Sequence, residues 1–458
     1  MQGVSPKGGT PFSALKNTFG RYPMKKLLTM LLCFVMALSC VFGVAACAPT
    51  DDMGNSGVVT PGGDQPGGTE QPGGDQPGGT EQPGGDQPGG DEQDPGGEET
   101  PEPAPEPSEG LEFFLVTEDD AESMKEILGY YYTPCYGLIG MGTCTDTDIV
   151  IPAEYNGLPV CVVRLDALSE SVTSLYFPDS VDLIFCEYAP NFRALTDLHL
   201  PHNPDLMIIK LSPSEITPSP FVNSAFYQDP DNWEDGALYI NDWLLATNET
   251  LPTDYTVKAG TYGIAGMAFL DFYDLENAYS SRSHVQRVVL PDSVKAFGGA
   301  FGACFSLKEV VLPPSLTKIS GMAFEACTAL ESITLPDSVT SIGMAAFGEC
   351  AGLMQIDIPE GVTHIGAAAF AGCIKLTNIE IPQGVTYIAK QAFENCYSLT
   401  SIVIPDSVTA IDDYAFMDCS SLTTVYYTGS EAEWEQIEIG SWNDELLNAE
   451  IVFNYKGE

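Results

Sequence analysis

Six cysteines recur at a fixed interval of 23 residues in the second half of this 458-residue chain. They are Cys304, Cys327, Cys350, Cys373, Cys396 and Cys419. A phenylalanine keeps the same interval from Phe301 to Phe416, and a proline keeps it from Pro313 to Pro405. Self-similarity at one period of this length predicts a solenoid, in which each coil is too small to bury its own apolar face and is stabilised by stacking on its neighbours.

One repeat, residues 330–350, indicates how a coil is built. Residues 330–335 (LESITL) have the apolar spacing of a short strand. Pro336 ends that strand, because proline cannot donate to a central ladder. A second apolar pair follows in residues 339–342, and residues 346–350 are expected to return to the core as a short helical or 3-10 segment. We therefore predict an α/β-type solenoid of 23-residue coils with short parallel strands.

This pattern resembles the BspA-like, or treponemal-type, bacterial leucine-rich repeat, which reads approximately LxxIxIPxxVxxIGxxAFxxC. Residues 307–425 match it almost position for position. The resemblance implies a curved right-handed leucine-rich-repeat solenoid whose parallel strands line one side. It also implies an exported or surface-attached bacterial protein, and a role in adhesion to host matrix proteins or to other cells.

A secretion signal is predicted from Met24. Lys25 and Lys26 form a positive n-region, an apolar run extends over residues 27–44, and small residues precede Cys47. This boundary resembles the lipobox of bacterial lipoproteins, in which the peptidase cuts before the cysteine and the thiol then carries diacylglycerol. We predict lipidation of Cys47 and a membrane-anchored lipoprotein exposed at the bacterial cell surface. An ordinary signal peptide or a transmembrane anchor, with Cys47 incidental, is the alternative.

A low-complexity stretch follows the predicted lipid anchor. Between Asp51 and Gly110 the chain has fifteen acidic residues and no Lys or Arg, with alternating PGGDQ and PGGTEQ units. Such a segment has almost no apolar side chains to offset the entropy of ordering, so we predict a disordered and extended tether.

The chain as a whole divides into five predicted segments. They are residues 1–46 (upstream residues and lipoprotein signal peptide, with the true start at Met24), 47–110 (lipidated cysteine and disordered linker), 111–284 (irregular leucine-rich repeats), 285–428 (regular repeats) and 429–458 (C-terminal cap). Within the irregular repeats, residues 233–246 resemble a hairpin commonly inserted in this family, with its turn at Asn241-Asp242.

The net charge and the cysteine spacing limit the classes of partner and cofactor that the chain is expected to bind. A formal net charge of −46 argues against nucleic acid, because phosphate binding needs a Lys and Arg surface. Cysteines on adjacent coils would lie about 4.8 Å apart with parallel side chains, whereas a disulfide needs converging side chains. We therefore expect free buried thiols rather than disulfides. With no CxxC motif and only four histidines, we predict no metal or other cofactor.

The candidate binding face consists of strand residues that alternate with the core positions and should point outward. These residues are Arg287, Glu309, Ser332, Thr334, Gln355, Asp357, Asn378, Glu380, Ser401, Val403, Thr424 and Tyr426. Host or microbial surface proteins or glycans could dock on this row of mostly small, polar and acidic side chains. The alternative is that they are simply solvated strand positions.

Motifs for catalysis are lacking in the sequence. It contains no nucleophile elbow, HExxH, P-loop or Rossmann fingerprint, so we expect no enzyme and name no catalytic residue. The interpretation is a cell-surface lipoprotein whose leucine-rich-repeat solenoid is a non-enzymatic binding or adhesion module. Two alternatives stay open: an envelope-organising structural protein, and a hydrolase with its site in residues 111–282.

Overall fold

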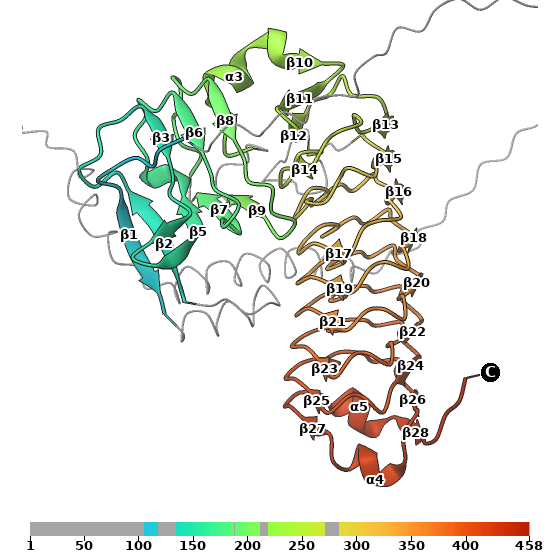
Figure 1. Ribbon diagram of the computed structural model, residues 1–458. Coiled ribbons are helices and arrows are strands. Elements are labelled where there is room, and N and C mark those ends of the chain that lie inside the picture. Colours follow the sequence, from blue (N-terminus) through green and yellow to red (C-terminus); the bar gives the residue numbers. More distant parts are fainter. Residues whose placement is uncertain (1–104, 118–133, 187, 211–218, 271–283, 458) are drawn as a thin grey trace, which may run out of the picture. The chain divides into compact units, whose positions relative to one another are not determined.

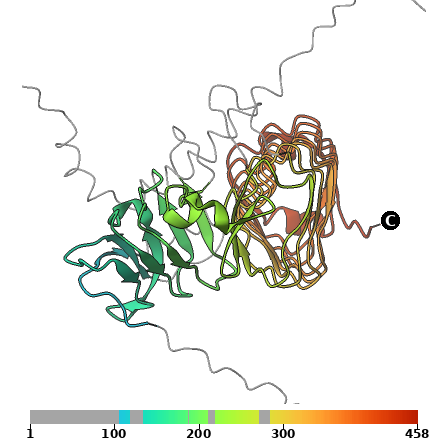
Figure 2. The ribbon, with the colours of Figure 1, turned by 90° about the horizontal axis from the view of Figure 1, so that it is seen from above.

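The computed structural model describes residues 105–117, 134–186, 188–210, 219–270 and 284–457 (Figure 1). The predicted signal peptide, Cys47 and all but the end of the predicted tether lie outside the described residues. From Glu106 onward the described residues belong to one compact unit. In Figure 2 the coils of its C-terminal half overlie one another, as stacked repeats must.

The first ladder of parallel strands runs along the regular repeats (Figure 1). Its strands are β13 (Asp254–Thr256), β15 (Arg287–Val289), β16 (Glu309–Val311), β18 (Ser332–Thr334), β20 (Gln355–Asp357), β22 (Asn378–Glu380), β24 (Ser401–Ile404), β26 (Thr424–Tyr427) and β28 (Glu450–Val452). Paired strands lie in register, with Ile333 opposite Ile356 and Ile402 opposite Val425. This register keeps every apolar middle residue of a strand on the core face.

A second ladder follows the proline of each coil. Its strands are β17 (Lys318–Ile319), β19 (Ser341–Ile342), β21 (His364–Ile365), β23 (Tyr387–Ile388), β25 (Ala410–Ile411) and β27 (Glu438–Ile439). These two-residue strands pair in parallel, with Ile342 opposite Ile365, and all but the last, β27, bury their isoleucine.

The irregular half contains two further sheets of mainly parallel strands. The parallel strands β3 (Asp148–Val150), β6 (Ser174–Tyr176) and β8 (Asp197–His199) form one sheet. The other sheet contains β1 (Glu112–Val116), β2 (Cys135–Gly140), β4 (Glu154–Tyr155), β5 (Leu158–Arg164), β7 (Leu183–Cys186) and β9 (Met207–Lys210), with the 3-10 turn η2 (Leu165–Ala167) after β5. In this second sheet β1 is antiparallel to β2, and β4 is antiparallel to β5.

The predicted hairpin insertion is confirmed. Strands β11 (Ala237–Ile240) and β12 (Trp243–Thr247) pair antiparallel, and Asn241 in the turn has a positive φ of 52°. The same sheet contains β10 (Trp233–Glu234) and β14 (Gly263–Ile264). Before it lie the helix α3 (Ala225–Gln228) and the 3-10 turn η3 (Pro230–Asn232). Asparagine tolerates the left-handed conformation that this tight turn requires.

The third side of each coil differs in detail from the short helical segment predicted there, because it is a run of turns. In one coil, Ala345 and Glu349 have positive φ values of 49° and 57°. A left-handed residue interrupts any right-handed helix. The backbone instead bonds to the next coil: the Ala345 N–H donates to Ala367 O and the Phe347 N–H to Ala369 O, each at 2.9 Å. We call this part of the coils the turn side.

A column of phenylalanine rings fills the core of the regular repeats. Its members are Phe301, Phe324, Phe347, Phe370, Phe393 and Phe416, all fully buried. Successive rings are stacked, with centroids 5.3 to 5.6 Å apart. The 23-residue interval of phenylalanine is therefore the period of one continuous aromatic stack.

The six repeat cysteines are free and buried, as expected from their spacing. Each thiol donates to the carbonyl oxygen of a core phenylalanine in the preceding coil, as in the 3.1 Å contact from Cys350 Sγ to Phe324 O. Burial raises the pKa of the Cys350 thiol, which keeps it protonated as a hydrogen-bond donor.

The expectation of free thiols is wrong for two cysteines of the irregular half. Cys135 on β2 and Cys161 on β5 form a disulfide between adjacent strands, with Cα atoms 6.2 Å apart. The strand register jumps here, because Tyr136 lies opposite Val160 but Gly137 lies opposite Val162. Cys161 is thus the extra residue of a β-bulge. A bulge bends the strand and re-aims its side chains, so the parallel-side-chain argument for regular coils does not apply.

Candidate binding surface

The row of predicted binding residues lies along the first ladder and points away from the core. In β16, β18, β20 and β22 the two outer residues of each strand are exposed and the middle residue is buried. This alternation follows from the two-residue period of a strand whose central valine or isoleucine enters the core. The exposed members predicted from sequence are Glu309, Ser332, Thr334, Gln355, Asp357, Asn378 and Glu380. We call these seven residues the strand row.

The remaining candidates extend the row at both ends and are only half exposed. They are Arg287 on β15, Ser401 and Val403 on β24, and Thr424 and Tyr426 on β26. Tyr426 is covered by the end of the chain, because its ring packs on Tyr455 with centroids 4.6 Å apart. The Tyr455 N–H also donates to Tyr427 O at 3.0 Å. Tyr426 is therefore part of the C-terminal cap as much as of the surface.

Most of the charged side chains along the row form no ion pair with another described residue. Arg287 Nε lies 3.1 Å from Glu309 Oε1, with side chains 40% and 57% exposed. An ion pair this exposed contributes little to stability. Asp357 and Glu380 form no ion pair with another described residue. Val311 and Met354 add apolar area beside the row, at 37% and 41% exposure. The row and its neighbours thus form a surface of polar, acidic and some apolar side chains that the fold does not need for its stability.

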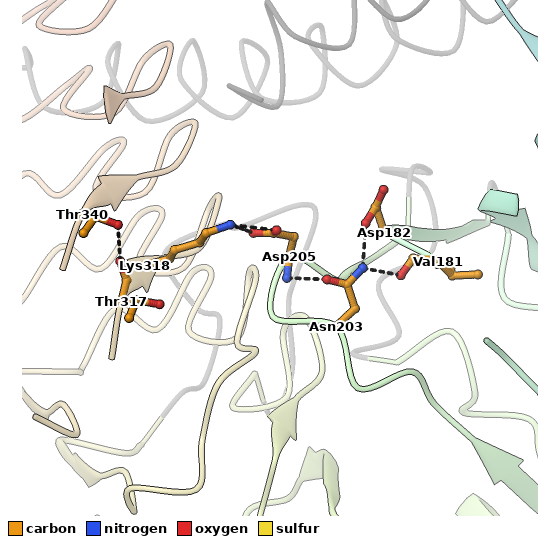
Figure 3. A network of polar contacts seen from close by, with 7 residues as sticks. All are labelled: Val181, Asp182, Asn203, Asp205, Thr317, Lys318 and Thr340. Atoms are coloured by element: carbon orange, nitrogen blue, oxygen red, sulfur yellow. Dashed lines mark hydrogen bonds and ion pairs between the residues drawn. The ribbon is translucent and has the colours of Figure 1, made fainter. Parts of the chain in front are cut away.

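The second ladder differs from the first, because one of its strands, β17, is bound to a loop of the irregular half. Lys318 Nζ on β17 contacts both carboxylate oxygens of Asp205, at 2.6 and 2.8 Å (Figure 3). Asn203 holds this loop in place: its Oδ1 accepts from the Asp205 N–H at 2.9 Å, and its Nδ2 donates to Val181 O at 3.0 Å and to Asp182 Oδ1 at 2.6 Å. Sequence reasoning missed this contact, which joins residues 113 positions apart.

Two carboxyl groups are buried on the turn side. Glu325 and Glu349 are each 5% exposed. Burial, and secondarily the charge of Glu349, raises the pKa of Glu325 to about 8. Burial favours the neutral acid because a charged carboxylate loses its hydration. These groups lie away from the strand row, and their burial could not be predicted from an acidic residue one or two positions after the core phenylalanine.

Catalytic and metal-binding arrangements were sought in the described residues. Within these ranges, no group of three or more His, Cys, Asp or Glu side chains could hold a metal ion. His202 Nε2 lies 2.8 Å from Asp242 Oδ2, which is an orientation typical of a general base. No described serine, threonine or cysteine joins this pair as a nucleophile. No helix among the described residues is long and apolar enough to span a bilayer.

Comparison with known proteins identifies the repeats. The family described as "BspA type Leucine rich repeat region" matches residues 275–367 and 298–423, with six copies. No curated protein matches the sequence.

Three solved structures are similar to the chain. A Treponema pallidum leucine-rich repeat protein is 25% identical, and the match covers 43% of this chain and 90% of that protein at a TM-score of 0.33. A leucine-rich cell surface protein from Faecalibacterium prausnitzii is 23% identical, with 66% and 93% covered and a TM-score of 0.29. A leucine-rich repeat protein from Bacteroides ovatus is 20% identical, with 71% and 77% covered and a TM-score of 0.33.

Proposed function

We propose, from the match of residues 275–423 to the BspA-type leucine-rich repeats, that this chain is a cell-surface lipoprotein with a non-enzymatic binding or adhesion module. Its ligands are surface proteins or glycans of the host or of other microbes. The observation that carries the proposal is the strand row, in which four successive coils present exposed side chains that neither the core nor the ladders need. A long regular face of this kind is what solenoids use for binding.

The proposed architecture places this module at a distance from a membrane. A lipid on Cys47 anchors the chain, and the acidic Pro/Gly-rich segment up to Gly110 acts as the spacer. Irregular repeats (111–284), regular repeats (285–428) and a cap (429–458) then form the exposed module. The disulfide between Cys135 and Cys161 supports export, since disulfides persist in oxidising compartments and are rare in the cytosol.

Charge reversal on the strand row tests the proposal. The purified mature protein is first bound to an array of host matrix proteins and glycans. The double variant Asp357→Lys/Glu380→Lys is then compared with Asp337→Lys/Glu360→Lys, which makes the same change of charge in exposed corner residues of neighbouring coils. We expect the row variant to bind at least tenfold more weakly and the corner variant to bind within twofold of the wild type.

The outcomes separate the proposal from its alternatives. Unchanged binding by the row variant would refute a ligand site on the row. Binding only to other copies of the protein or to isolated cell envelope would favour the envelope-organising role instead. Turnover of an arrayed glycan by the wild type, lost in His202→Ala, would favour a hydrolase in the irregular half.

A further inference from the structure

A second surface feature lies where the turn side meets the C-terminal cap. In each regular coil, the residue two positions before the core phenylalanine has a positive φ. These residues are Met322, Ala345, Ala368, Gln391 and Tyr414, with φ between 49° and 63°. Trp442 in the cap takes the next place, with φ 64°, because the Tyr414 N–H donates to Ser441 O at 2.9 Å as it would to a further coil.

Aromatic residues are poor choices for this position. A positive φ is uncommon for any residue with a side chain and is an outlier for a bulky one. Such strain persists where the surroundings enforce it, and it gathers at ligand sites. The coils before the cap use alanine or unbranched side chains here, whereas the last two rungs carry Tyr414 and Trp442. Aromatic residues thus replace alanine and unbranched residues at the last regular coil and in the cap, where the stack of coils ends.

The two rings form a flat, ordered pair. Their planes are inclined by 8°, with centroids 6.0 Å apart. Lys390 Nζ lies 5.9 Å from the Tyr414 centroid, over that ring. Trp442 is 59% exposed, the highest value among the exposed large hydrophobic side chains of the described residues. Its large exposed area on an otherwise capped end is the feature that the fold leaves unexplained. We call Tyr414 and Trp442 the aromatic pair.

The backbone beneath the aromatic pair is held rigidly by Asn443. This side chain is 1% exposed, and its Oδ1 accepts from the Phe416 N–H at 2.9 Å. Its Nδ2 donates to Asp412 O at 2.9 Å and to Gly440 O at 3.0 Å. Asn443 thereby substitutes for the backbone of a missing coil and fixes Trp442 in place, so a ligand would meet a preorganised ring at low entropic cost.

Acidic groups lie on the same segments as the aromatic pair. Asp412 follows β25 and accepts a hydrogen bond from the Tyr387 hydroxyl, and the Tyr387 side chain is itself 43% exposed. Asp413 Oδ1 accepts from the Ser441 N–H at 2.6 Å. From Ser430 to Tyr455 the cap has no Lys or Arg but seven acidic residues: Glu431, Glu433, Glu435, Glu438, Asp444, Glu445 and Glu450. This field repels anionic ligands and a second copy of the same cap.

We propose that the aromatic pair is a stacking site for a pyranose ring of a neutral polysaccharide. The C–H bonds on one face of a pyranose pack against the exposed indole of Trp442, while its hydroxyls donate to the acidic groups around the pair. The near-parallel rings suit a flat sugar ring, whereas a quaternary ammonium group needs rings that enclose it. This site is separate from the strand row, so either can fail without the other.

The test uses the mature full-length protein and four neutral probes: cellohexaose, chitohexaose, maltohexaose and mannohexaose. Binding is measured by calorimetry and by tryptophan fluorescence. Trp442 is the most exposed of the four tryptophans, since Trp233 is half-buried and Trp243 and Trp434 are buried, and the Trp442 variants identify its share of the signal. The variants are Trp442→Gly and Trp442→Phe. The control is Leu447→Ala, which removes another exposed apolar side chain, 54% exposed, from α5 (Asp444–Asn448) of the same cap.

We expect at least one hexasaccharide to bind and shift the fluorescence, with at least tenfold weaker binding in Trp442→Gly, a smaller loss in Trp442→Phe and no change in Leu447→Ala. The melting temperature of Trp442→Gly should change little, because relief of the positive-φ strain offsets loss of the stack on Tyr414. Two results would each overturn the proposal: no binding of any hexasaccharide, or binding that survives Trp442→Gly in a folded variant.

Discussion

Replacing one ring in the middle of the phenylalanine column measures how the coils stabilise one another. Phe347 is fully buried and stacks on Phe324 at 5.4 Å and on Phe370 at 5.5 Å. Truncation of a buried phenylalanine to alanine costs about 3–5 kcal/mol. A stacked pair contributes about 0.5–1.5 kcal/mol beyond the buried area. Phe347→Ala removes two such pairs, so its loss of unfolding free energy should lie at the upper end of that range.

The two ends of the column supply matched comparisons. Phe416 is equally buried but stacks on Phe393 alone, at 5.4 Å. Phe269, in the irregular half, stacks on Phe301 at 4.9 Å and meets Tyr255 edge to face at 6.2 Å. Phe416→Ala loses one aromatic pair, so it should be less destabilising than Phe347→Ala by about 1 kcal/mol. Phe269→Ala loses one stacked and one edge-to-face pair, so it should be less destabilising than Phe347→Ala by a smaller amount, which comes from its place beside the irregular coils.

Urea unfolding of the three variants, followed by fluorescence, gives the free energies to compare. Nearest-neighbour coupling in a solenoid is the reason for the expected order. If Phe269→Ala proves as destabilising as Phe347→Ala, the irregular and regular halves form one equally packed stack. The predicted division at about residue 284 would then be wrong.

Three further predictions concern the cysteines and a buried acid. Cys47→Ala should release the protein from the membrane fraction or leave it unprocessed. Mass spectrometry of the wild type should find two or three acyl groups on Cys47, since a single acyl chain binds a membrane only marginally. A wholly soluble wild type that retains residues 1–46 would contradict this prediction. A thiol reagent should label none of the six repeat cysteines in native buffer and all six in denaturant, with Cys135 and Cys161 reacting only after reduction. Glu325 has a pKa raised from 4.5 to about 8, so the folded protein retains a proton that the unfolded chain has lost, and stability should fall as pH rises through this interval. Glu325→Gln should flatten that fall in urea midpoints measured at pH 5 and pH 8; an unchanged slope would mean that the carboxyl is solvated.

The regular repeats could be predicted from sequence because one interval determines them. In β16, β18, β20 and β22 the central Ile or Val is buried and its two neighbours are exposed, as the alternation of Ser332 and Thr334 about Ile333 predicts. The stacked phenylalanines and the buried thiols follow from the same period. The hairpin turn at Asn241 was visible because asparagine marks a left-handed turn between two apolar runs.

Contacts between distant or irregular segments could not be predicted. No periodic signal links Lys318 to Asp205, because the pair joins two different parts of the stack. The disulfide depends on a bulge at Cys161 that changes the register by one residue, and nothing in the local sequence marks that bulge. The turn side was expected to be a short helical or 3-10 segment, yet Ala345 and Glu349 adopt positive φ and their N–H groups bond to the next coil.

In the cap, two residues occupy equivalent positions although the interval between them is longer than one repeat. Tyr414 and Trp442 are separated by 28 residues instead of 23, because the helix α4 (Glu431–Trp434) and its flanking turns are inserted between them. A search at the repeat interval therefore stops at Tyr414. The pairing of β27 with β25, the hydrogen bond from Tyr414 N–H to Ser441 O and the Asn443 side chain bonded to Phe416 place Trp442 in the position that follows Tyr414.

The two proposed surfaces differ in how freely their side chains can vary. Strand-row residues such as Gln355 make no contact that stacking requires, and exposed substitutions of this kind usually change stability by less than about 0.5 kcal/mol. Ligand specificity on the row can therefore change without loss of the fold. Trp442 instead occupies a positive-φ position whose backbone the cap imposes, so any side chain there carries strain that glycine would relieve. The stack on Tyr414 accounts for one face of the indole, and the oligosaccharide titrations test whether a ligand accounts for the exposed remainder of the ring.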